Sequence, residues 1–390
     1  MTVLDDEVRI GLLWPKTGPK TKTGAECIEA GHGTIAMLEA EGVIPRGRVR
    51  LLEGDSHSVE STLSETERLI GEGAHVVHGT ILSDWAVPAA RAAAAADVVY
   101  WEAVAASEDI TDQGLTNFFR ANVNCSRYAA DMARFIGETL VPSWDGGAST
   151  TVAVVYTNAS FTRSLAEMFR DQAERHGLRV TAFESVAQTP ADYGDLLRDI
   201  AAKEPDVVVA STFDAPVPEL YRTAVEMGIR PRAWLGTGSW ALHYKVDSLG
   251  PLLDGVYAAG TPHLSATAPE RLGERGRRRF SAWKRATTIP HSDSTAVDRD
   301  LSVLALETLI ADVLPRVESW GVDNVRNAAL ALDLPLGDNL LGYGMKFDEL
   351  GNNERSFAAI LQWQGGKLET VDPPLIATAA PMAAGGAPID

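Results

Sequence analysis

Short apolar runs alternate with longer amphipathic stretches along the first 115 residues of the chain. The runs at residues 10–13, 49–52 and 98–101 are rich in branched or aromatic side chains and have the length of buried strands. The stretches between them place apolar residues at helical spacing, and two of these stretches end at Gly42 and Gly71. This alternation of strand and helix predicts a parallel sheet with helices on both faces.

The same pattern begins again after residue 150. It predicts strands at 151–156, 179–183, 207–210 and 233–236, with helices at 161–176, 189–203 and 216–227. Further on, residues 255–260 read as extended, 302–314 as an apolar helix and 341–363 as a β hairpin. The sequence therefore predicts an α/β protein with two doubly wound parallel-sheet lobes.

Polar and aromatic residues follow two neighbouring predicted strands of the first sheet. Ser83, Asp84 and Trp85 come after the strand at 76–77, and Glu102 and the loop that reaches Ser107 come after the strand at 98–101. The carboxyl ends of parallel strands share one sheet edge, and small ligands bind there in open α/β sheets. We therefore expect a small-molecule site at this edge, although many such loops have no function.

Six aromatic residues lie on or beside the loops at the expected ligand-binding edges, in a chain with only 7% aromatic residues. Part of this set can equally belong to the cores. The concentration nevertheless favours a ligand with a flat or apolar body. The six are Trp14, Trp85, Trp101, Phe161, Phe213 and Trp240.

Composition narrows the range of partners. The 390 residues carry a formal net charge of -18, which disfavours nucleic acid as a partner because the phosphate backbone would be repelled. The one basic cluster, at residues 271–285, reads as the outer face of a surface helix or, less simply, as a docking patch. No apolar run is long enough to span a membrane. No leader precedes the first strand, so either a leader has been removed or the protein is cytosolic.

Motifs for catalysis are missing from the sequence. There is no GxSxG, HExxH or phosphate-binding GxxxxGK[ST] pattern, and GTGSW at 236–240 lacks the third glycine of a dinucleotide fingerprint. Cys27 and Cys125 are compatible with one disulfide or with two free thiols, and their spacing suggests no metal site. We expect neither cofactor nor catalysis, and two lobes with ligand-type loops favour binding without turnover.

The order of these segments resembles that of the type I periplasmic binding proteins, in the branch typified by the leucine/isoleucine/valine-binding protein. The resemblance covers residues 8–371. Its markers are WPKTGP after the first strand, the Asp55 turn, the GTILS loop at 79–83, the loop ending in Asp109-Ile110-Thr111, Phe119-Arg120, PDVVV at 205–209 and FDELG at 347–351.

The resemblance implies two lobes joined by three hinge segments near Arg120, Tyr257 and Leu341. Residues 1–119 and 258–340 would form lobe 1, and residues 120–257 and 341–373 would form lobe 2. A solute would be trapped by closure of the lobes, which changes the surface offered to a membrane partner. Residues 374–390, rich in alanine, proline and glycine, read as a disordered tail.

The ligand positions of the family carry over unevenly. Ser83 matches the serine that holds the ligand's carboxylate, and Phe161 matches the aromatic residue that covers the ligand. The second loop maps to Val104, Ala105 and Ala106, so its threonine is missing. The acidic residue that receives the ligand's ammonium falls at Gly238, for which Asp214 or Glu102 are alternative carboxylates. The predicted ligand-binding residues are Trp14, Thr23, Ser83, Asp84, Trp85, Glu102, Val104, Ala105, Ala106, Phe161, Phe213, Asp214, Gly238 and Ser239.

The resemblance implies a solute receptor of an ABC-type importer, located in the periplasm or at the cell surface and working with permease subunits in the membrane. Its solute would be an amino acid, an aromatic or other organic acid, or an amide. A cytosolic small-molecule sensor of the same fold that regulates a partner protein is the alternative. Because Gly238 and Ala106 lack the expected polar groups, we expect no binding of leucine, isoleucine or valine in the usual family manner.

Overall fold

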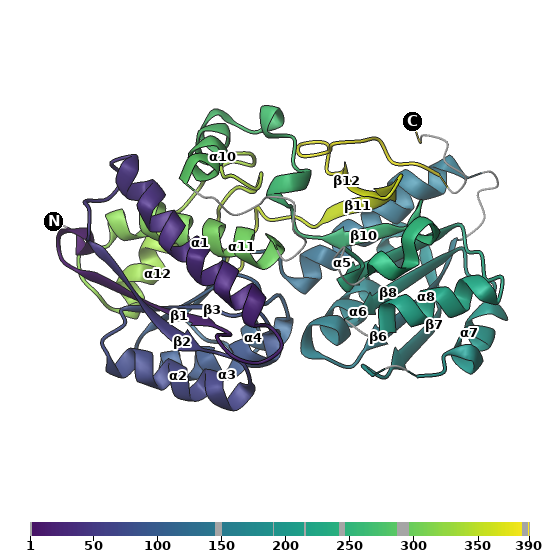
Figure 1. The fold of residues 1–390 in the computed structure, drawn as a ribbon, viewed down its shortest axis with the longest axis horizontal. Helices are drawn as coiled ribbons and strands as arrows, with labels where there is room; N and C mark the ends of the chain where they lie inside the picture. Colours follow the sequence, from purple (N-terminus) through teal and green to yellow (C-terminus); the bar gives the residue numbers. More distant parts are fainter. Residues whose placement is uncertain are drawn as a thin grey trace. The chain divides into compact units, whose positions relative to one another are not determined.

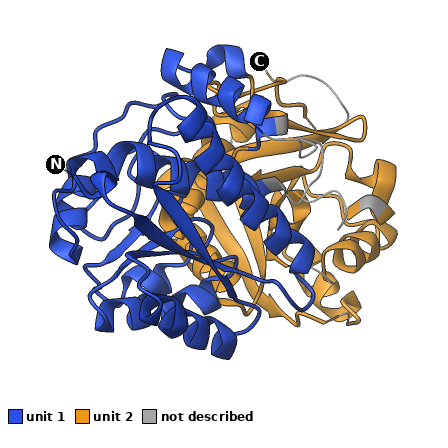
Figure 2. Ribbon diagram, turned by 60° about the vertical axis from the view of Figure 1, so that its left-hand side comes forward, with its two compact units in different colours: residues 1–124, 263–265, 269–356 blue, residues 125–262, 266–268, 357–390 orange. Residues whose placement is uncertain are grey.

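The computed structural model describes residues 2–144, 150–189, 191–213, 216–241, 246–286, 296–383 and 389. The chain divides into two compact units, coloured separately in Figure 2. Unit 1 comprises residues 1–124, 263–265 and 269–356, and unit 2 comprises residues 125–262, 266–268 and 357–390. The chain therefore passes between the units near residues 124, 262–269 and 356.

The last of these passages differs from the expected one. Residues 341–356 lie in unit 1, whereas the sequence analysis assigned them to the second lobe. Hydrogen bonds within unit 1 explain the difference. Asn352 Oδ1 accepts from Arg120 at 2.5 Å, and Asn353 Nδ2 donates to the carbonyl of Ala121 at 3.0 Å.

Unit 1 contains a parallel five-stranded sheet in the order β2-β1-β3-β4-β5, of which β1, β2 and β3 are labelled in Figure 1. The predicted alternation of strands and helices is confirmed in this unit. Its main elements are β1 (Val8–Trp14), α1 (Thr21–Ala40), β2 (Val49–Asp55), α2 (Val59–Gly71), β3 (Val76–Gly79), α3 (Ser83–Ala95), β4 (Val99–Glu102), α4 (Glu108–Thr111), β5 (Phe118–Arg120), α10 (Glu274–Ala286), α11 (Ala296–Thr308) and α12 (Val322–Leu330).

Side chains alternate between the two faces of this sheet, as the pleat requires. Leu13, Val77 and Tyr100 belong to the core shared with α2 and α3. Trp101, the next residue after Tyr100, faces α11, where its indole nitrogen donates to the carbonyl of Ala305 at 2.8 Å. Both faces are therefore covered by helices, and the apolar strand runs reflect that double burial.

Unit 2 contains a seven-stranded sheet in the order β12-β11-β10-β9-β8-β6-β7. The strands from β7 to β10 are parallel, as predicted, but β11 and β12 run antiparallel at one end. The hairpin predicted at 341–363 is present only as an antiparallel bridge between Phe347 and Asn353 around the turn at 348–351. The extended hairpin comes later and turns at Gly365 and Gly366. The main elements are α5 (Cys125–Phe135), β6 (Thr150–Thr157), α6 (Ser160–Ala173), β7 (Leu178–Val186), α7 (Gly194–Ala201), β8 (Val207–Thr212), α8 (Pro216–Glu226), β9 (Ala233–Gly238), β10 (Tyr257–Gly260), β11 (Ala359–Gln364) and β12 (Lys367–Asp372).

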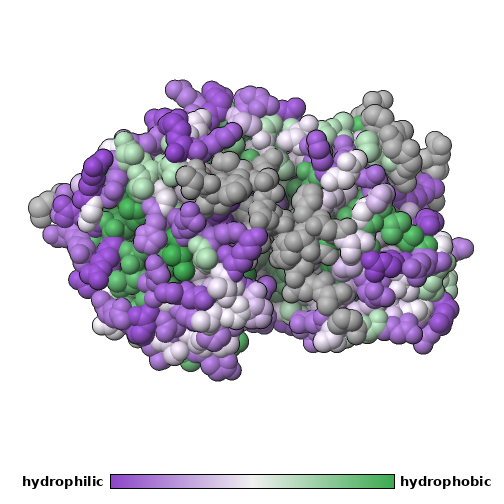
Figure 3. Space-filling model, viewed as in Figure 1, coloured by the Kyte–Doolittle hydropathy of each residue, from purple (hydrophilic) through white to green (hydrophobic). Residues whose placement is uncertain are grey.

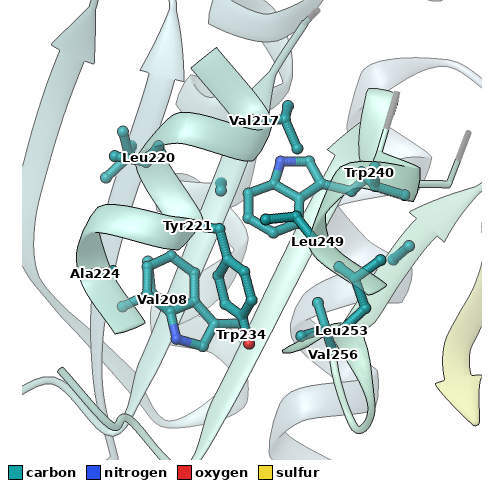
Figure 4. Close-up of a cluster of buried hydrophobic side chains, with 14 of the residues drawn as sticks. Val208, Val217, Leu220, Tyr221, Ala224, Trp234, Trp240, Leu249, Leu253 and Val256 are labelled. Atoms are coloured by element: carbon teal, nitrogen blue, oxygen red, sulfur yellow. The ribbon is translucent and has the colours of Figure 1, made fainter. Parts of the chain in front are cut away.

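An aromatic cluster fills the core between the unit 2 sheet and α8 (Figure 4). The Tyr221 ring meets the rings of Trp234 and Trp240 edge-on, with centroid separations of 5.3 and 5.6 Å. A Cβ atom at Gly236 would lie 2.0 Å from the Trp240 ring, so only glycine fits there. The GTGSW sequence thus serves core packing, and Trp240 is a core residue rather than a cleft aromatic.

The chain beyond residue 373 does not behave as the expected disordered tail over the part that the structure describes. Ile376 is buried, and the amide of Thr378 donates to the carbonyl of Thr370 on β12 at 2.8 Å. The amide of Met382 donates to Gln362 at 2.8 Å. Apolar Ile376 and these hydrogen bonds fix the segment against the sheet, an effect that its alanine and proline content concealed.

Hydrophilic residues cover much of the face drawn in Figure 3, with smaller apolar areas between them. Large apolar side chains that are exposed include Val59 and Leu63 on α2. Among the described residues, no helix is both long enough and apolar enough to cross a membrane.

The basic cluster on α10 is only partly a surface feature. Arg279 is buried and forms ion pairs with Glu41, next to the end of α1, and with Glu307 of α11, the latter at 2.8 Å. Arg275 is paired with Asp312 at 2.6 Å. Burial raises the pKa of Glu307 to about 7, against the influence of Arg279. The interpretation of this cluster as the outer face of a surface helix therefore holds only in part, because Arg275 and Arg279 bind acidic residues of neighbouring helices in unit 1.

Replacement of Arg279 by alanine should therefore destabilise the protein, by about 3 to 5 kcal/mol, because it leaves the buried Glu307 carboxylate poorly compensated. Urea unfolding measures the change. Arg278→Ala, on the same helix but exposed, is the matched control and should change the free energy of unfolding by less than about 0.5 kcal/mol. Equal effects of the two substitutions would contradict the assignment.

Candidate functional site

The edge of the unit 1 sheet has a topological switch between β1 and β3. The chain leaves β1 for β2 on one side, while β3 pairs with β1 on the other. The loops that follow β1 and β3 therefore diverge, and small ligands bind at switch points of this kind in open α/β sheets. The first turn of α1 approaches this edge closely, since a Cβ atom at Gly24 would lie 1.8 Å from the carbonyl oxygen of Pro15.

Glu102, the last residue of β4, is fully buried at this edge and binds two loops. Its carboxylate accepts from the amide of Thr80 at 2.9 Å and from the amides of residues 103–105 at 2.8 to 3.0 Å. The Tyr100 hydroxyl also donates to it, at 2.8 Å. Burial raises the pKa of Glu102 to about 7, although the hydrogen bonds favour the ionised form.

Arg120 binds carbonyl groups of the same loop. This buried residue of β5 donates to the carbonyls of Ala105 and Ser107 at 3.2 and 3.0 Å. Arg120 is also the register partner of Glu102 across the β4–β5 pair. One buried carboxylate therefore holds the loop's N–H groups, and one buried guanidinium holds its C=O groups.

Ser83 is tied to this loop by its hydroxyl group. The Ser83 Oγ accepts from the amide of Ser107 at 3.2 Å, and the residue is 3% exposed at the start of α3. This bond uses the oxygen as an acceptor, which leaves the hydroxyl hydrogen to donate to another group. Ser83 and the loop at 103–107 thus form one hydrogen-bonded unit.

Other predicted residues of this edge lie in different environments. Asp84 is exposed, and Trp85 and Thr23 are half-buried. Thr23 lies in the first turn of α1, which begins at Thr21. Val104 is half-buried, and its carbonyl accepts from Asn122 at 3.0 Å, whereas Ala105 and Ala106 are buried.

Trp14 and Trp101 are fully buried in the unit 1 core, so their indoles do not lie on the loops. Trp14 meets the ring of His78 edge-on at 5.5 Å. His78 lies in turn between the sheet and α11, where Nδ1 donates to the carbonyl of Trp101 at 2.9 Å and Nε2 is 3.1 Å from Ser302 Oγ. His78 could not be identified from the sequence, because a single histidine inside a strand has no diagnostic spacing.

Unit 2 has its own topological switch, between β6 and β8. Phe161 in the first turn of α6 and Phe213 after β8 lie at this edge, with ring centroids 5.4 Å apart. Tyr128 of α5 meets Phe161 edge-on at 6.0 Å. The structure thus brings together two of the predicted aromatic residues, both half-buried and so available for contact.

Gly238 ends β9 beside Phe213. Its φ is +62°, and a Cβ atom there would lie 2.9 Å from the Phe213 ring. The ring therefore occupies the space that a side chain at this position would need. Ser239, the next residue, is buried. Asp214, the alternative carboxylate, lies outside the described residues.

In the described parts of the chain, no group of three or more His, Cys, Asp or Glu side chains could hold a metal ion. Cys27 and Cys125 are buried free thiols in different units, which answers the question left open by their spacing. The unit 1 edge thus presents the Ser83 hydroxyl, which is hydrogen-bonded to the loop at 103–107. The unit 2 edge presents an aromatic surface of Phe161 and Phe213.

The architecture of two α/β units with these switch-point edges is that of the type I periplasmic binding proteins. The sequence matches the family model described as periplasmic binding protein over residues 7–296. The chain belongs to this family. It is 27% identical to the Leu/Ile/Val-binding protein homolog 7 of Brucella suis biovar 1 (strain 1330) over 371 residues, which cover 94% of this chain and 92% of the relative.

Solved structures show the same fold. An ABC transporter substrate-binding protein from Desulfitobacterium hafniense in complex with Leu has a TM-score of 0.72 at 19% identity, and the match covers 94% of this chain and all of that one. A solute-binding protein of an ABC transporter from R. palustris in complex with 4-hydroxybenzoate has a TM-score of 0.74 at 15% identity, covering 98% of both chains.

The buried position of His78 predicts a pH dependence of stability. Burial lowers the pKa of His78 to about 4, so the folded protein binds fewer protons than the unfolded chain between about pH 4 and about pH 6.5. The stability that neutral His78 contributes is complete above that range and is lost as the pH falls through it.

Between about pH 7 and about pH 5, the free energy of unfolding of the wild type should fall by about 2 kcal/mol more than that of His78→Gln. Urea unfolding of both proteins at several pH values measures this difference. Parallel pH profiles would contradict the assignment.

Proposed function

We propose that this protein is the solute-binding receptor of an ABC-type importer, and that its solute is an amino acid, an aromatic or other organic acid, or an amide. Within this class we favour an acid or amide with an apolar body. The observation that carries the proposal is the pairing of Phe213 with Gly238. An aromatic ring fills the place where an ammonium-binding side chain would lie. The solute would be captured by closure of the two lobes, without turnover.

The polar end of the solute is assigned to Ser83. Its hydroxyl, fixed by the amide of Ser107, has its hydrogen left to donate to a carboxylate or carbonyl oxygen. The apolar body is assigned to Phe161 and Phe213, whose rings supply contact area with defined geometry. The relative bound to 4-hydroxybenzoate shows that the fold accommodates such a solute.

The membership of the chain in a family of periplasmic binding proteins supports location in the periplasm or at the cell surface, with permease subunits as partners. Amino acids remain within the solute class. They would need a carboxylate other than one at position 238 to receive the ammonium group, because a buried ammonium without a partner costs several kcal/mol.

A thermal-shift screen over aromatic acids, aliphatic acids, amides and amino acids identifies the solute, since ligands that bind only the folded state raise the apparent stability. We expect the largest shifts from acids or amides with a ring or a long apolar body. Calorimetry should show binding of leucine, isoleucine and valine at least about a hundredfold weaker than that of the best solute. Micromolar or tighter binding of any of the three would contradict the assignment.

Ser83→Ala should weaken binding of the solute found in the screen by about 1 to 2 kcal/mol, which is roughly tenfold in Kd, because one hydrogen bond to the solute's oxygen is lost. Calorimetry measures the change. Ser64→Ala, an exposed serine on α2, is the control and should bind as the wild type does. A Ser83→Ala variant with unchanged affinity and stability would remove Ser83 from the site.

A further inference from the structure

We propose that Glu102 is a positioning residue, whose carboxylate occupies an anion-binding nest of backbone amides and thereby sets the conformation of both unit 1 loops at the candidate site. The inference deepens the proposed function and rests on it only for the link to the solute. The role of the nest in shaping the loops stands on the hydrogen bonds themselves.

The hydrogen-bond partners of the Glu102 carboxylate are all donors. Four backbone amides, those of Thr80 and residues 103–105, and the hydroxyl of Tyr100 donate to its two oxygens. A carboxylate offers about four lone-pair sites, so these five donor groups saturate it. The group is therefore complementary to the protein's own backbone, and a ligand ammonium could reach it only by displacing loop contacts.

The two loops depend on this one group because they come from different strands. Thr80 follows β3, whereas residues 103–105 follow β4. Successive amides that converge on one point form a concave anion site of the kind that binds phosphate or carboxylate ligands in other proteins. In this chain the anion site is occupied by a carboxylate of the protein itself, that of Glu102.

The nest also positions Ser83. Residues 103–105 lead directly to Ser107, whose amide holds the Ser83 hydroxyl at 3.2 Å. Arg120 fixes the carbonyls of Ala105 and Ser107 from the neighbouring strand. Displacement of the loop from Glu102 would therefore shift the hydroxyl that we assign to the solute's polar end.

Chemical rescue tests this inference. Glu102→Ala leaves a buried void lined by amides, so its melting temperature should fall by about 5 °C or more. Sodium formate, compared with sodium chloride at equal ionic strength, should restore part of that loss in a saturable manner, because formate is a carboxylate small enough for the void. The wild type, whose nest is filled, should not respond.

Val77→Ala is the matched control. Val77 is buried on the neighbouring strand, on the same face of the sheet, and its core neighbours are apolar, so its cavity offers no anion site. This variant should lose stability but show no specific response to formate. An equal formate response in Val77→Ala, or no response in a folded Glu102→Ala, would overturn the proposal.

Glu102→Gln decides the matter if the alanine variant does not fold. The glutamine keeps the size of the side chain but turns one acceptor into a donor that faces donors. Amide hydrogen exchange of the segment at 103–105 should then be at least about tenfold faster than in the wild type, while α7 of unit 2 is unchanged. Wild-type exchange rates in that segment would overturn the proposal.

The outcomes also separate this inference from the proposed function. Formate rescue together with a solute screen that finds no ligand would reject the receptor function and leave the positioning role of Glu102 intact. A bound solute together with absent formate rescue would reject the positioning role alone.

Discussion

The unit 1 edge depends on the buried carboxylate of Glu102. Burial of a charge costs several kcal/mol unless hydrogen bonds compensate it, and here the compensation comes almost entirely from the backbone of two loops. The same hydrogen bonds stabilise one conformation of the two loops. Arg120 completes the arrangement by donating to two loop carbonyls, which the carboxylate cannot bind because both groups are acceptors. The hydroxyl of Ser83 is held in place as a consequence of both.

The edge of the unit 2 sheet carries an aromatic surface in place of a charged group. The position that the resemblance assigns to a charged side chain is Gly238, and the ring of Phe213 lies in the space that a side chain there would need. Phe161 lies 5.4 Å away and extends the aromatic surface. A solute that meets this surface gains contact area rather than a charge interaction, which is the physical basis for assigning it an apolar body.

The sequence predicted the strands and most helices because doubly covered parallel strands are continuous apolar runs. It also predicted which loops share an edge, since that follows from strand direction alone. It could not separate core aromatics from edge aromatics. Trp14 and Trp101 lie at or near strand ends, yet their side chains pack into the core between the sheet and its helices, and position along a strand does not reveal this.

The environments of buried charged residues were even harder to predict from the sequence. Glu102 was predicted as a ligand residue from its place after a strand, but its hydrogen bonds to residues 103–105 depend on a loop conformation that no spacing reveals. Arg120 could have been found, because it lies two residues after Phe118 and so shares a face with a buried aromatic residue. The burial of Arg279 within the basic cluster could not be predicted, because its partners, Glu41 and Glu307, are distant in sequence.

The most direct test of the account is a crystal structure of the protein with the acid or amide that gives the largest thermal shift. The account predicts a solute oxygen within hydrogen-bond distance of Ser83 Oγ, its apolar body against Phe161 and Phe213, and the amides of residues 103–105 still bound to Glu102. A solute whose carboxylate replaces Glu102 on those amides, or whose body lies away from both phenylalanines, would contradict it.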